Sequence, residues 1–270
     1  MVAIILIIII LACVYALLVM PRTTMKPNMN SITCDYAHRG LFDNEGGVPE
    51  NSMAAFDKAV KGGYGIELDV QLTKDKEVVV FHDYDLKRAC SVDAKVSELT
   101  LEELQTYGLF GTEYKIPTLA DVLDLVEGRV PLLVELKGED KNTAICHSAS
   151  ALLSLYDGAY SVESFNPLLL RWFKKNCPQV ARGQLVTNLL KAKKSGFFLD
   201  FVLTHMLLNF LSRPDFIAAD EKHLRNASVR ICTSAFGARL FVFTVSKKEH
   251  FDIIRENGDH SIFEAFDPKK

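Results

Sequence analysis

Residues 65–72 read GIELDVQL, an apolar run that carries two carboxylates, Glu67 and Asp69. Side chains two residues apart on a β-strand point to the same side of it, so both acids belong to one face. Burying an unpaired charge in a strand this apolar is costly, and the two carboxylates therefore need a cationic partner or a metal ion. The run predicts a buried strand with one chemically active face.

The same arrangement returns downstream, where residues 131–136 form an apolar run that contains Glu135 and is followed by Lys137. Further strand-like runs alternate with helix-length stretches along the chain. Eight such strands with helices between them predict an α/β fold, a (β/α)8 TIM barrel. The expected strands are residues 32–37, 65–72, 77–81, 131–136, 159–164, 181–186, 216–219 and 240–245, and the expected helices between them are 51–61, 118–127, 143–155, 167–175 and 247–257.

The barrel domain is predicted to span residues 32–270. Residues 83–115 are a long polar excursion after the third strand. We expect them to form a small insertion with a short helix at 97–104, in place of the ordinary helix. Residues 21–31 are polar and rich in Pro and Asn, which indicates a linker.

Residues 1–20 are predicted to be a transmembrane anchor. Residues 2–20 carry no charge, and at about 1.5 Å per residue a helix of this length nearly spans a bilayer core about 30 Å thick. A cleaved signal peptide is the alternative, but no Lys or Arg precedes the run and its only A-x-A-like pattern, residues 14–16, lies inside it. Arg22 and Lys26 follow the run, so the positive-inside tendency favours a single-pass protein with a cytoplasmic barrel.

Charge and cysteine usage exclude some classes of protein. The formal net charge of the 270 residues is −3 with no long block of like charge, unlike the basic surface of a nucleic-acid-binding protein. Of the six cysteines, one lies in the predicted anchor, and the other five show no CxxC spacing. This indicates reduced thiols and argues against both a disulfide framework and a structural zinc site. No protein partner is predicted.

A second apolar stretch, residues 197–211 (FFLDFVLTHMLLNFL), is broken by four polar residues. It is too short and interrupted for a membrane span. We expect a buried barrel helix after the sixth strand. The alternative is a helix on the membrane surface, because basic residues flank the stretch: Lys191, Lys193, Lys194 and Arg213.

Polar residues gather at the ends of the first four predicted strands, and in TIM barrels the carboxyl ends of the strands form the active site. Any one of these residues has an ordinary explanation, such as a solvated acidic pair or a structural histidine. Four strands that carry them at the same end indicate one site. The residues are His38 and Arg39 on the first strand, Glu67 and Asp69 on the second, His82 on the third, and Glu135 and Lys137 on the fourth.

This set of side chains suits one kind of chemistry. Two histidines can exchange protons. Three carboxylates with no cysteine nearby suit one hard divalent cation, Mg²⁺ or Ca²⁺, better than zinc. An arginine and a lysine can neutralise a phosphate. Together these are the parts of a metal-assisted phosphodiesterase.

The order of these motifs resembles that of the glycerophosphodiester phosphodiesterase family, from Tyr36 almost to the C-terminus. Residues 83–115 are similar to that family's insertion. One departure is visible in the last predicted strand, where members often carry Trp-Thr-Val-Asn and this chain has Phe243-Thr244-Val245-Ser246. The matching motifs are His38-Arg39-Gly40, Pro49-Glu50-Asn51, Glu67-Leu68-Asp69-Val70, Phe81-His82-Asp83, Pro117-Thr118-Leu119, Glu135-Leu136-Lys137 and Ser164-Phe165.

The resemblance implies a role for each matching position. The carboxylates would bind one divalent cation, the histidines would be general acid and base, and the cationic side chains would hold the phosphate of a glycerophosphodiester, which is cleaved to sn-glycerol 3-phosphate and an alcohol. An aromatic ring at Phe243 would contact the substrate. The expected roles are metal binding for Glu67, Asp69 and Glu135, catalysis for His38 and His82, substrate binding for Arg39, Lys137 and Phe243, and support of the site for Glu50 and Asn51.

Two other functions stay open on the sequence. A lysophospholipase D or related phospholipase that acts on membrane lipid is supported by the apolar N-terminus and by residues 197–211. A non-catalytic barrel used for binding would have lost a histidine or a carboxylate of the set, and this chain has kept all of them.

Overall fold

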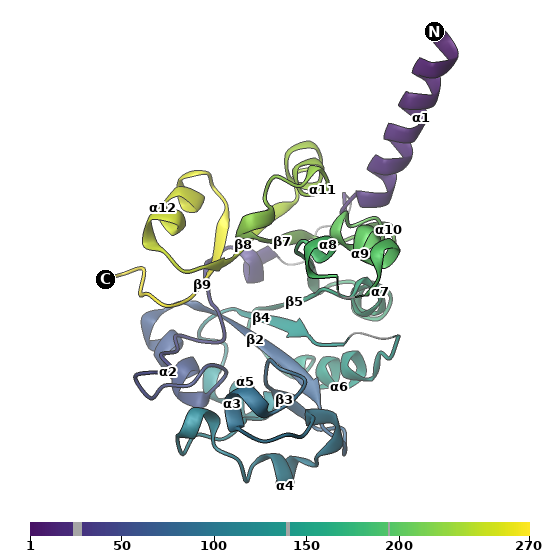
Figure 1. Cartoon of the computed structure of the whole chain (residues 1–270). Coiled ribbons are helices and arrows are strands. Elements are labelled where there is room, and N and C mark those ends of the chain that lie inside the picture. Colours follow the sequence, from purple (N-terminus) through teal and green to yellow (C-terminus); the bar gives the residue numbers. More distant parts are fainter. Residues whose placement is uncertain (24–28, 139–140, 194) are drawn as a thin grey trace.

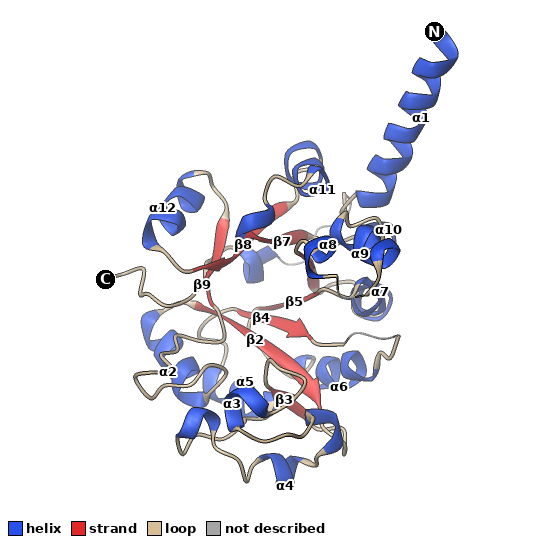
Figure 2. Ribbon diagram, in the orientation of Figure 1, coloured by secondary structure: helices blue, strands red, loops and turns tan. Residues whose placement is uncertain are grey.

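The computed structural model describes residues 1–23, 29–138, 141–193 and 195–270. Eight parallel strands close into a barrel with helices around it (Figures 1 and 2), so the predicted TIM barrel is confirmed. The ring closes at β1, which pairs with β2 on one side and with β9 on the other. Its strands, in order around the barrel, are β1 (Tyr36–Ala37), β2 (Gly65–Leu72), β4 (Leu132–Leu136), β5 (Tyr160–Ser164), β6 (Ala181–Val186), β7 (Phe216–Asp220), β8 (Arg239–Val245) and β9 (His260–Phe263).

The helices are mostly short, and several begin as the sequence predicts. Ser52 accepts a hydrogen bond from the Ala55 N–H at the start of α2, and Thr118 and Asp121 form a capping box at the start of α5. The helices are α1 (Val2–Val19), α2 (Met53–Gly62), α3 (Lys87–Cys90), α4 (Leu101–Leu104), α5 (Leu119–Val126), α6 (Ala144–Leu153), α7 (Pro167–Asn176), α8 (Leu189–Ala192), α9 (Phe197–Thr204), α10 (Asn209–Ser212), α11 (Ala227–Arg230) and α12 (Lys248–Glu256), with single turns η1 (Met29–Ile32), η2 (Val96–Glu98), η3 (Leu109–Gly111), η4 (Glu221–His223) and η5 (Ile231–Ala235).

The predicted third strand exists but is not a strand of the barrel. It is β3 (Val78–Val80), which runs antiparallel to the end of β2 in a hairpin, with Val80 opposite Val70. The eighth place in the ring is taken by β9. An apolar run predicts a strand equally well in either direction, so periodicity alone placed β3 wrongly.

The inward positions of the barrel strands divide its interior into two layers. Successive side chains of a strand point to opposite faces, so every second residue points inward. The layer nearer the amino ends is packed with fully buried apolar side chains, among them Tyr36, Leu133, Phe216 and Phe241. Further along, β1 is followed by His38, β4 continues with Glu135, and β2 contributes Glu67 and Asp69, whereas β7 and β8 continue with the apolar Ala218 and Phe243. The barrel therefore has a closed apolar base beneath a charged layer at the carboxyl ends of its strands.

The helix α1 is attached to the barrel by its last turn only. Residues 1–14 are exposed, whereas Val19 is buried against Val186, Ile217 and Cys232. It is the one helix of the described residues long and apolar enough to cross a membrane. Lys26, on which the predicted orientation partly rests, lies outside the described residues, as does Lys194.

Residues 197–211 do not form the buried helix that the sequence favours. They contain α9 and α10, and Phe197 and Phe198 are 79% and 80% exposed. Within α9, the buried residues are the polar Asp200 and Thr204. Composition predicted that the apolar side chains would face the barrel, but the hydrogen bonds of the two polar side chains fix the opposite face inward.

Candidate active site

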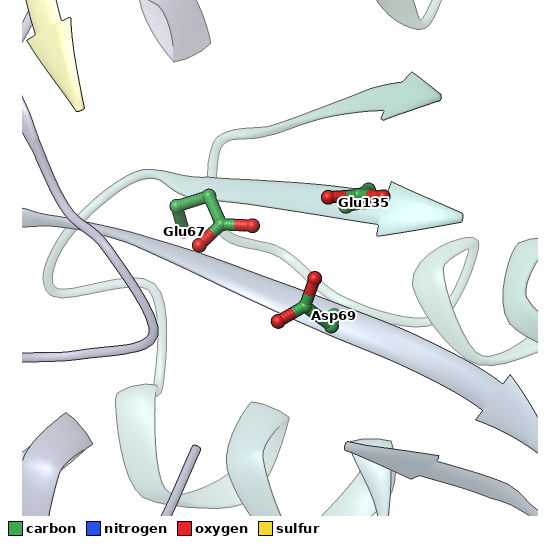
Figure 3. Close-up of side chains that lie close together, drawn as sticks. All are labelled: Glu67, Asp69 and Glu135. Atoms are coloured by element: carbon green, nitrogen blue, oxygen red, sulfur yellow. The ribbon is translucent and has the colours of Figure 1, made fainter. Parts of the chain in front are cut away.

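Three buried carboxylates lie together at the carboxyl end of β2 and β4 (Figure 3). Glu67 and Asp69 are both inward residues of β2, and the parallel register places Asp69 directly beside Glu135 of β4. One oxygen from each of the three lies within 4.8 Å of one from each of the others. The predicted metal ligands are therefore brought together by strand alternation and register alone.

Burial and mutual repulsion make these acids hard to ionise. Burial raises the pKa of Glu67 well above its ordinary value, and the charge of Asp69 raises it further. Burial raises the pKa of Glu135 to about 7. Asp69 differs, because the nearby Lys137, His82 and Arg39 outweigh its burial and hold its pKa below the ordinary value.

Lys137 is the cation closest to this cluster. Its Nζ lies 2.8 Å from Asp69 Oδ1 and 2.8 Å from Glu135 Oε1. Burial disfavours the ammonium, but the two carboxylates outweigh it and hold the pKa of Lys137 above its ordinary value. The side chain is thus charged and already paired with two of the three acids.

Each histidine is held by a carboxylate at Nδ1. His38 Nδ1 lies 2.7 Å from Glu264 Oε2, and His82 Nδ1 lies 2.6 Å from Asp83 Oδ1. In a neutral imidazole the nitrogen next to a carboxylate carries the proton, so Nε2 is left as the proton acceptor. His38 Nε2 is 4.0 Å from Glu67 Oε2. Burial lowers the pKa of His82, which favours its neutral form.

A tight turn after β1 directs Arg39 into the charged layer. The backbone N–H of Arg39 donates to Glu67 Oε2, and its guanidinium contacts Glu50 at 2.6 Å and Asp69 at 3.5 Å. Gly40, with φ of +81°, follows; a Cβ there would lie 2.8 Å from the backbone carbon of Ala55. Only glycine fits this turn without displacing α2, which explains the His-Arg-Gly sequence.

The two predicted supporting residues, Glu50 and Asn51, contact the charged side chains of the site. Asn51 donates from Nδ2 to Asp69 Oδ2 at 2.8 Å, and its backbone N–H donates to Arg39 O. Glu50 accepts hydrogen bonds from both Arg39 and Arg88. Although burial opposes its ionisation, these two guanidiniums lower the pKa of Glu50 to about 2.

Comparison with known proteins identifies the family to which the chain belongs. Residues 38–264 match the glycerophosphoryl diester phosphodiesterase family. The chain belongs to that family. A glycerophosphodiester phosphodiesterase of Caldanaerobacter subterraneus is 30% identical over 235 residues, which cover 82% of this chain and 89% of that one. The chain is accordingly an enzyme, a phosphoric diester hydrolase.

One solved structure of similar fold and one further relative are informative. A phosphodiesterase of Oleispira antarctica, solved with its product sn-glycerol-3-phosphate, shares the fold with a TM-score of 0.70 at 24% identity, over 87% of this chain and 93% of that one. A human lysophospholipase D is 40% identical over 111 residues, which are 40% of this chain and 33% of that one.

The tertiary structure brings several further side chains to the site to which the sequence assigned no role. Glu264 follows β9 and holds His38, and Arg88 joins Glu50 to Asp83. Glu163 of β5 lies beside Glu135 in register, and burial raises its pKa well above the ordinary value. The position of Glu163 near the end of a predicted strand could have indicated a place in the site. The contact of Glu264 with His38 joins residues 226 positions apart, and no local sequence pattern indicates it.

The predicted substrate-contacting ring Phe243 is half-buried on β8, which β9 and β1 separate from β2. It packs edge-on against Phe165, which follows β5, with ring centroids 6.0 Å apart. An aromatic pair therefore accompanies the charged side chains at the mouth of the barrel.

Proposed function

We propose that this enzyme hydrolyses glycerophosphodiesters to sn-glycerol 3-phosphate and an alcohol, with one divalent cation, Mg²⁺ or Ca²⁺, and with His38 and His82 as general acid and base. The proposal rests on one arrangement: two carboxylate-held histidines beside three buried carboxylates, with Arg39 and Lys137 between them. No other cluster of at least three potential metal-binding side chains occurs in the described part of the chain.

The donor set fits a hard cation. Glu67, Asp69 and Glu135 offer only carboxylate oxygens, all three are buried, and no cysteine belongs to the cluster. Burial, and after it the charge of Asp69, raises the pKa of Glu67 and Glu135, and a bound cation would favour their ionised forms. When bound there, a divalent cation supplies Lewis acidity and offsets the negative charge of the phosphate.

The chain's own side chains supply the proton transfers. The leaving alkoxide needs a proton, and the attacking hydroxyl, whether of water or of the substrate itself, must lose one. Glu264 and Asp83 keep Nδ1 of each histidine occupied, so the transfers fall to Nε2 of His38 and His82. The lowered pKa of His82 suits a group that accepts a proton near neutral pH.

The cationic side chains bind the phosphate, and the aromatic pair at the mouth takes the rest of the substrate. Arg39 is fixed by Glu50. Lys137, which lies beside Asp69 and Glu135, would bring a second positive charge to the phosphate. Phe243 and Phe165 offer an apolar wall for the glycerol or alcohol part of the diester.

A lysophospholipase D is the second candidate. The partial identity to the human lysophospholipase D and the exposed apolar side chains of α1 and α9 favour it. A purely binding function has less support, because the three expected metal ligands lie together and both expected catalytic histidines lie beside them.

We further propose that residues 1–20 anchor the enzyme in a membrane, that residues 21–31 link the anchor to the barrel of residues 32–270, and that residues 83–115 are an insertion in it. The exposed apolar surface of α1 supports an anchor. The positions of Arg22 and Lys26 in the sequence favour a cytoplasmic barrel.

The test is a substrate panel on full-length enzyme, with glycerophosphocholine and a lysophospholipid, assayed with and without chelator. We expect glycerol 3-phosphate release from the soluble diester, abolished by EDTA and restored by Mg²⁺ or Ca²⁺ better than by Zn²⁺. Turnover of the lysophospholipid alone would favour the second candidate, and full turnover in excess EDTA would contradict the metal assignment.

A further inference from the structure

The helix α9 turns apolar side chains outward and polar side chains toward the protein, which is the reverse of an ordinary surface helix. Phe197 and Phe198 are 79% and 80% exposed, while Asp200 and Thr204 are 1% and 2% exposed. A surface helix of a soluble domain turns its apolar side to the core. The exterior of α9 is therefore suited to an apolar environment outside the protein.

Internal hydrogen bonds fix this orientation. Asp200 Oδ1 accepts from the Ser195 N–H at 3.0 Å, and Thr204 Oγ1 accepts from the Leu189 N–H at 3.1 Å. Turning the phenylalanines inward would break both bonds and expose their partners. The exposed side chains form what we call the α9 patch: Phe197, Phe198, Leu199 and Phe201.

The end of α9 and the following helix α10 lie at the base of α1. The Ser228 hydroxyl donates to the carbonyl of His205, just after α9, and lies 2.6 Å from the Tyr15 hydroxyl of α1. The last turn of α1 is fixed in the same region by Asn209, which donates to Val19 O, and by Arg213, which donates to Leu17 O and Met20 O. From there α1 projects away from the barrel, with α8, α9 and α10 grouped around its base (Figure 1).

The location of the patch relates it to the active site. The α8–α9 segment follows the carboxyl end of β6, the same end of the barrel at which the carboxylates lie. Lys191 and Lys193, at the end of α8, are exposed. An exposed apolar helix with basic residues next to it is the pattern of an interfacial membrane helix, and the lysines match the charge of anionic headgroups.

We propose that the α9 patch inserts into the boundary between headgroups and acyl chains of a lipid bilayer that α1 spans, so that the rim of the active site lies against the lipid surface. The occupant is a bilayer rather than a protein groove, because the exposed α9 patch belongs to the same group of helices, α8 to α10, that holds the base of the apolar 18-residue helix α1. At about 1.5 Å per residue, α1 alone is about 27 Å long, close to a bilayer core. The inference rests on the proposed anchor for the place of the bilayer, and on the proposed activity only for its consequence: diesters embedded in the bilayer reach the mouth directly.

The first test measures depth in the membrane. Full-length Phe198→Trp is reconstituted into vesicles of phosphatidylcholine and phosphatidylglycerol, with and without brominated acyl chains, beside the parent, which carries Trp172 on α7. The matched control is Leu155→Trp, at an exposed apolar position after α6 that is 84% exposed. We expect blue-shifted, bromine-quenched emission from Phe198→Trp and water-like, unquenched emission from Leu155→Trp. Equal quenching of the two, or emission from Phe198→Trp that depends on protein concentration instead of on bromine, would overturn the proposal.

The second test measures the consequence. The double variant Phe197→Ser/Phe198→Ser is compared with Leu155→Ser on a lysophospholipid in vesicles and on soluble glycerophosphocholine. Losing the burial of two phenylalanines should lower turnover of the vesicle substrate about tenfold and leave the soluble substrate unaffected. An equal loss on both substrates would contradict membrane docking as the role of the patch. If the parent were inactive on both substrates, the proposed function would be refuted. The quenching experiment would still show whether the α9 patch inserts into the bilayer.

Discussion

At the scale of single residues, each of the two histidines proposed to be catalytic is paired with a carboxylate at Nδ1. His38 is held by Glu264 after the last strand, and His82 by its sequence neighbour Asp83. Neither histidine is placed among the three carboxylates that would bind the cation. Proton transfer and metal binding should therefore respond separately to mutation.

We predict that His38→Ala and His82→Ala each lower kcat by about 10²–10⁴-fold, the usual scale for acid–base groups, while metal binding stays nearly intact. Glu67→Gln should weaken both metal binding and rate, because it removes one of the three ligand charges. The measurement is calorimetric metal titration of the folded variants beside their kinetics. Near-normal turnover in either histidine variant would remove that residue from the mechanism, and parental metal affinity in Glu67→Gln would mean that this acid is not a ligand.

At the scale of elements, the β2–β3 hairpin and the insertion after it complete the site. Because β3 runs back along β2, the Phe81 N–H donates to Asp69 O, and His82 follows at once. The insertion is then tied to the barrel by Arg88, which contacts both Asp83 and Glu50. Glu50 is thus the point where the insertion, the turn after β1 and the charged layer meet.

We predict that this junction makes stability depend on acid pH. The folded-state pKa of Glu50, about 2, lies below its ordinary value of 4.5. The contribution of Glu50 to the free energy of unfolding is therefore complete above about pH 4.5 and is lost as the pH falls toward 2. The pKa shift corresponds to about 3 kcal/mol. Denaturant unfolding at a series of pH values should show a shallower acid slope for Glu50→Gln than for the parent.

The matched control for that series is Glu113→Gln, at an exposed glutamate of the same insertion. Its acid slope should follow the parent. If Glu50→Gln keeps the parental slope, the ion pairs of Glu50 do not couple the insertion to the stability of the barrel.

At the scale of the whole molecule, the charged layer sits on a closed apolar base, and two of its three clustered acids, Glu67 and Glu135, hold protons more tightly than usual. The pKa of Glu135 is raised to about 7 by burial, and that of Glu67 is raised well above its ordinary value. A cation can bind only the ionised carboxylates. Metal binding, proton release and stability of the fold should therefore be linked.

We predict that Mg²⁺ or Ca²⁺ raises the unfolding temperature, and raises it more at pH 8 than at pH 6. A cation at about 100 times its Kd adds about 2.7 kcal/mol to the free energy of unfolding. At pH 6 this increment in the free energy of unfolding is smaller, because the cation must first displace protons from Glu67 and Glu135. Thermal unfolding at both pH values, with calorimetry in two buffers to count released protons, measures the effect; an increment independent of pH, with no proton released, would contradict it.

The fold class and most members of the candidate site follow from local patterns in the amino-acid sequence. Alternation along an apolar strand is a local property, so the sequence suffices to assign Glu67, Asp69 and Glu135 to inward faces, and their register in the barrel agrees. The same holds for the residues that end strands, His38 and Lys137. Their roles in catalysis and metal binding remain predictions.

The arrangement of distant or ambiguous segments, by contrast, is set only by the tertiary structure. The direction of β3, the closure of the ring by β9 and the contact of Glu264 with His38 depend on pairings between segments, which local periodicity does not encode. The orientation of α9 has the same origin: its composition favours burial, but the hydrogen bonds of Asp200 and Thr204 to other parts of the chain turn the phenylalanines outward.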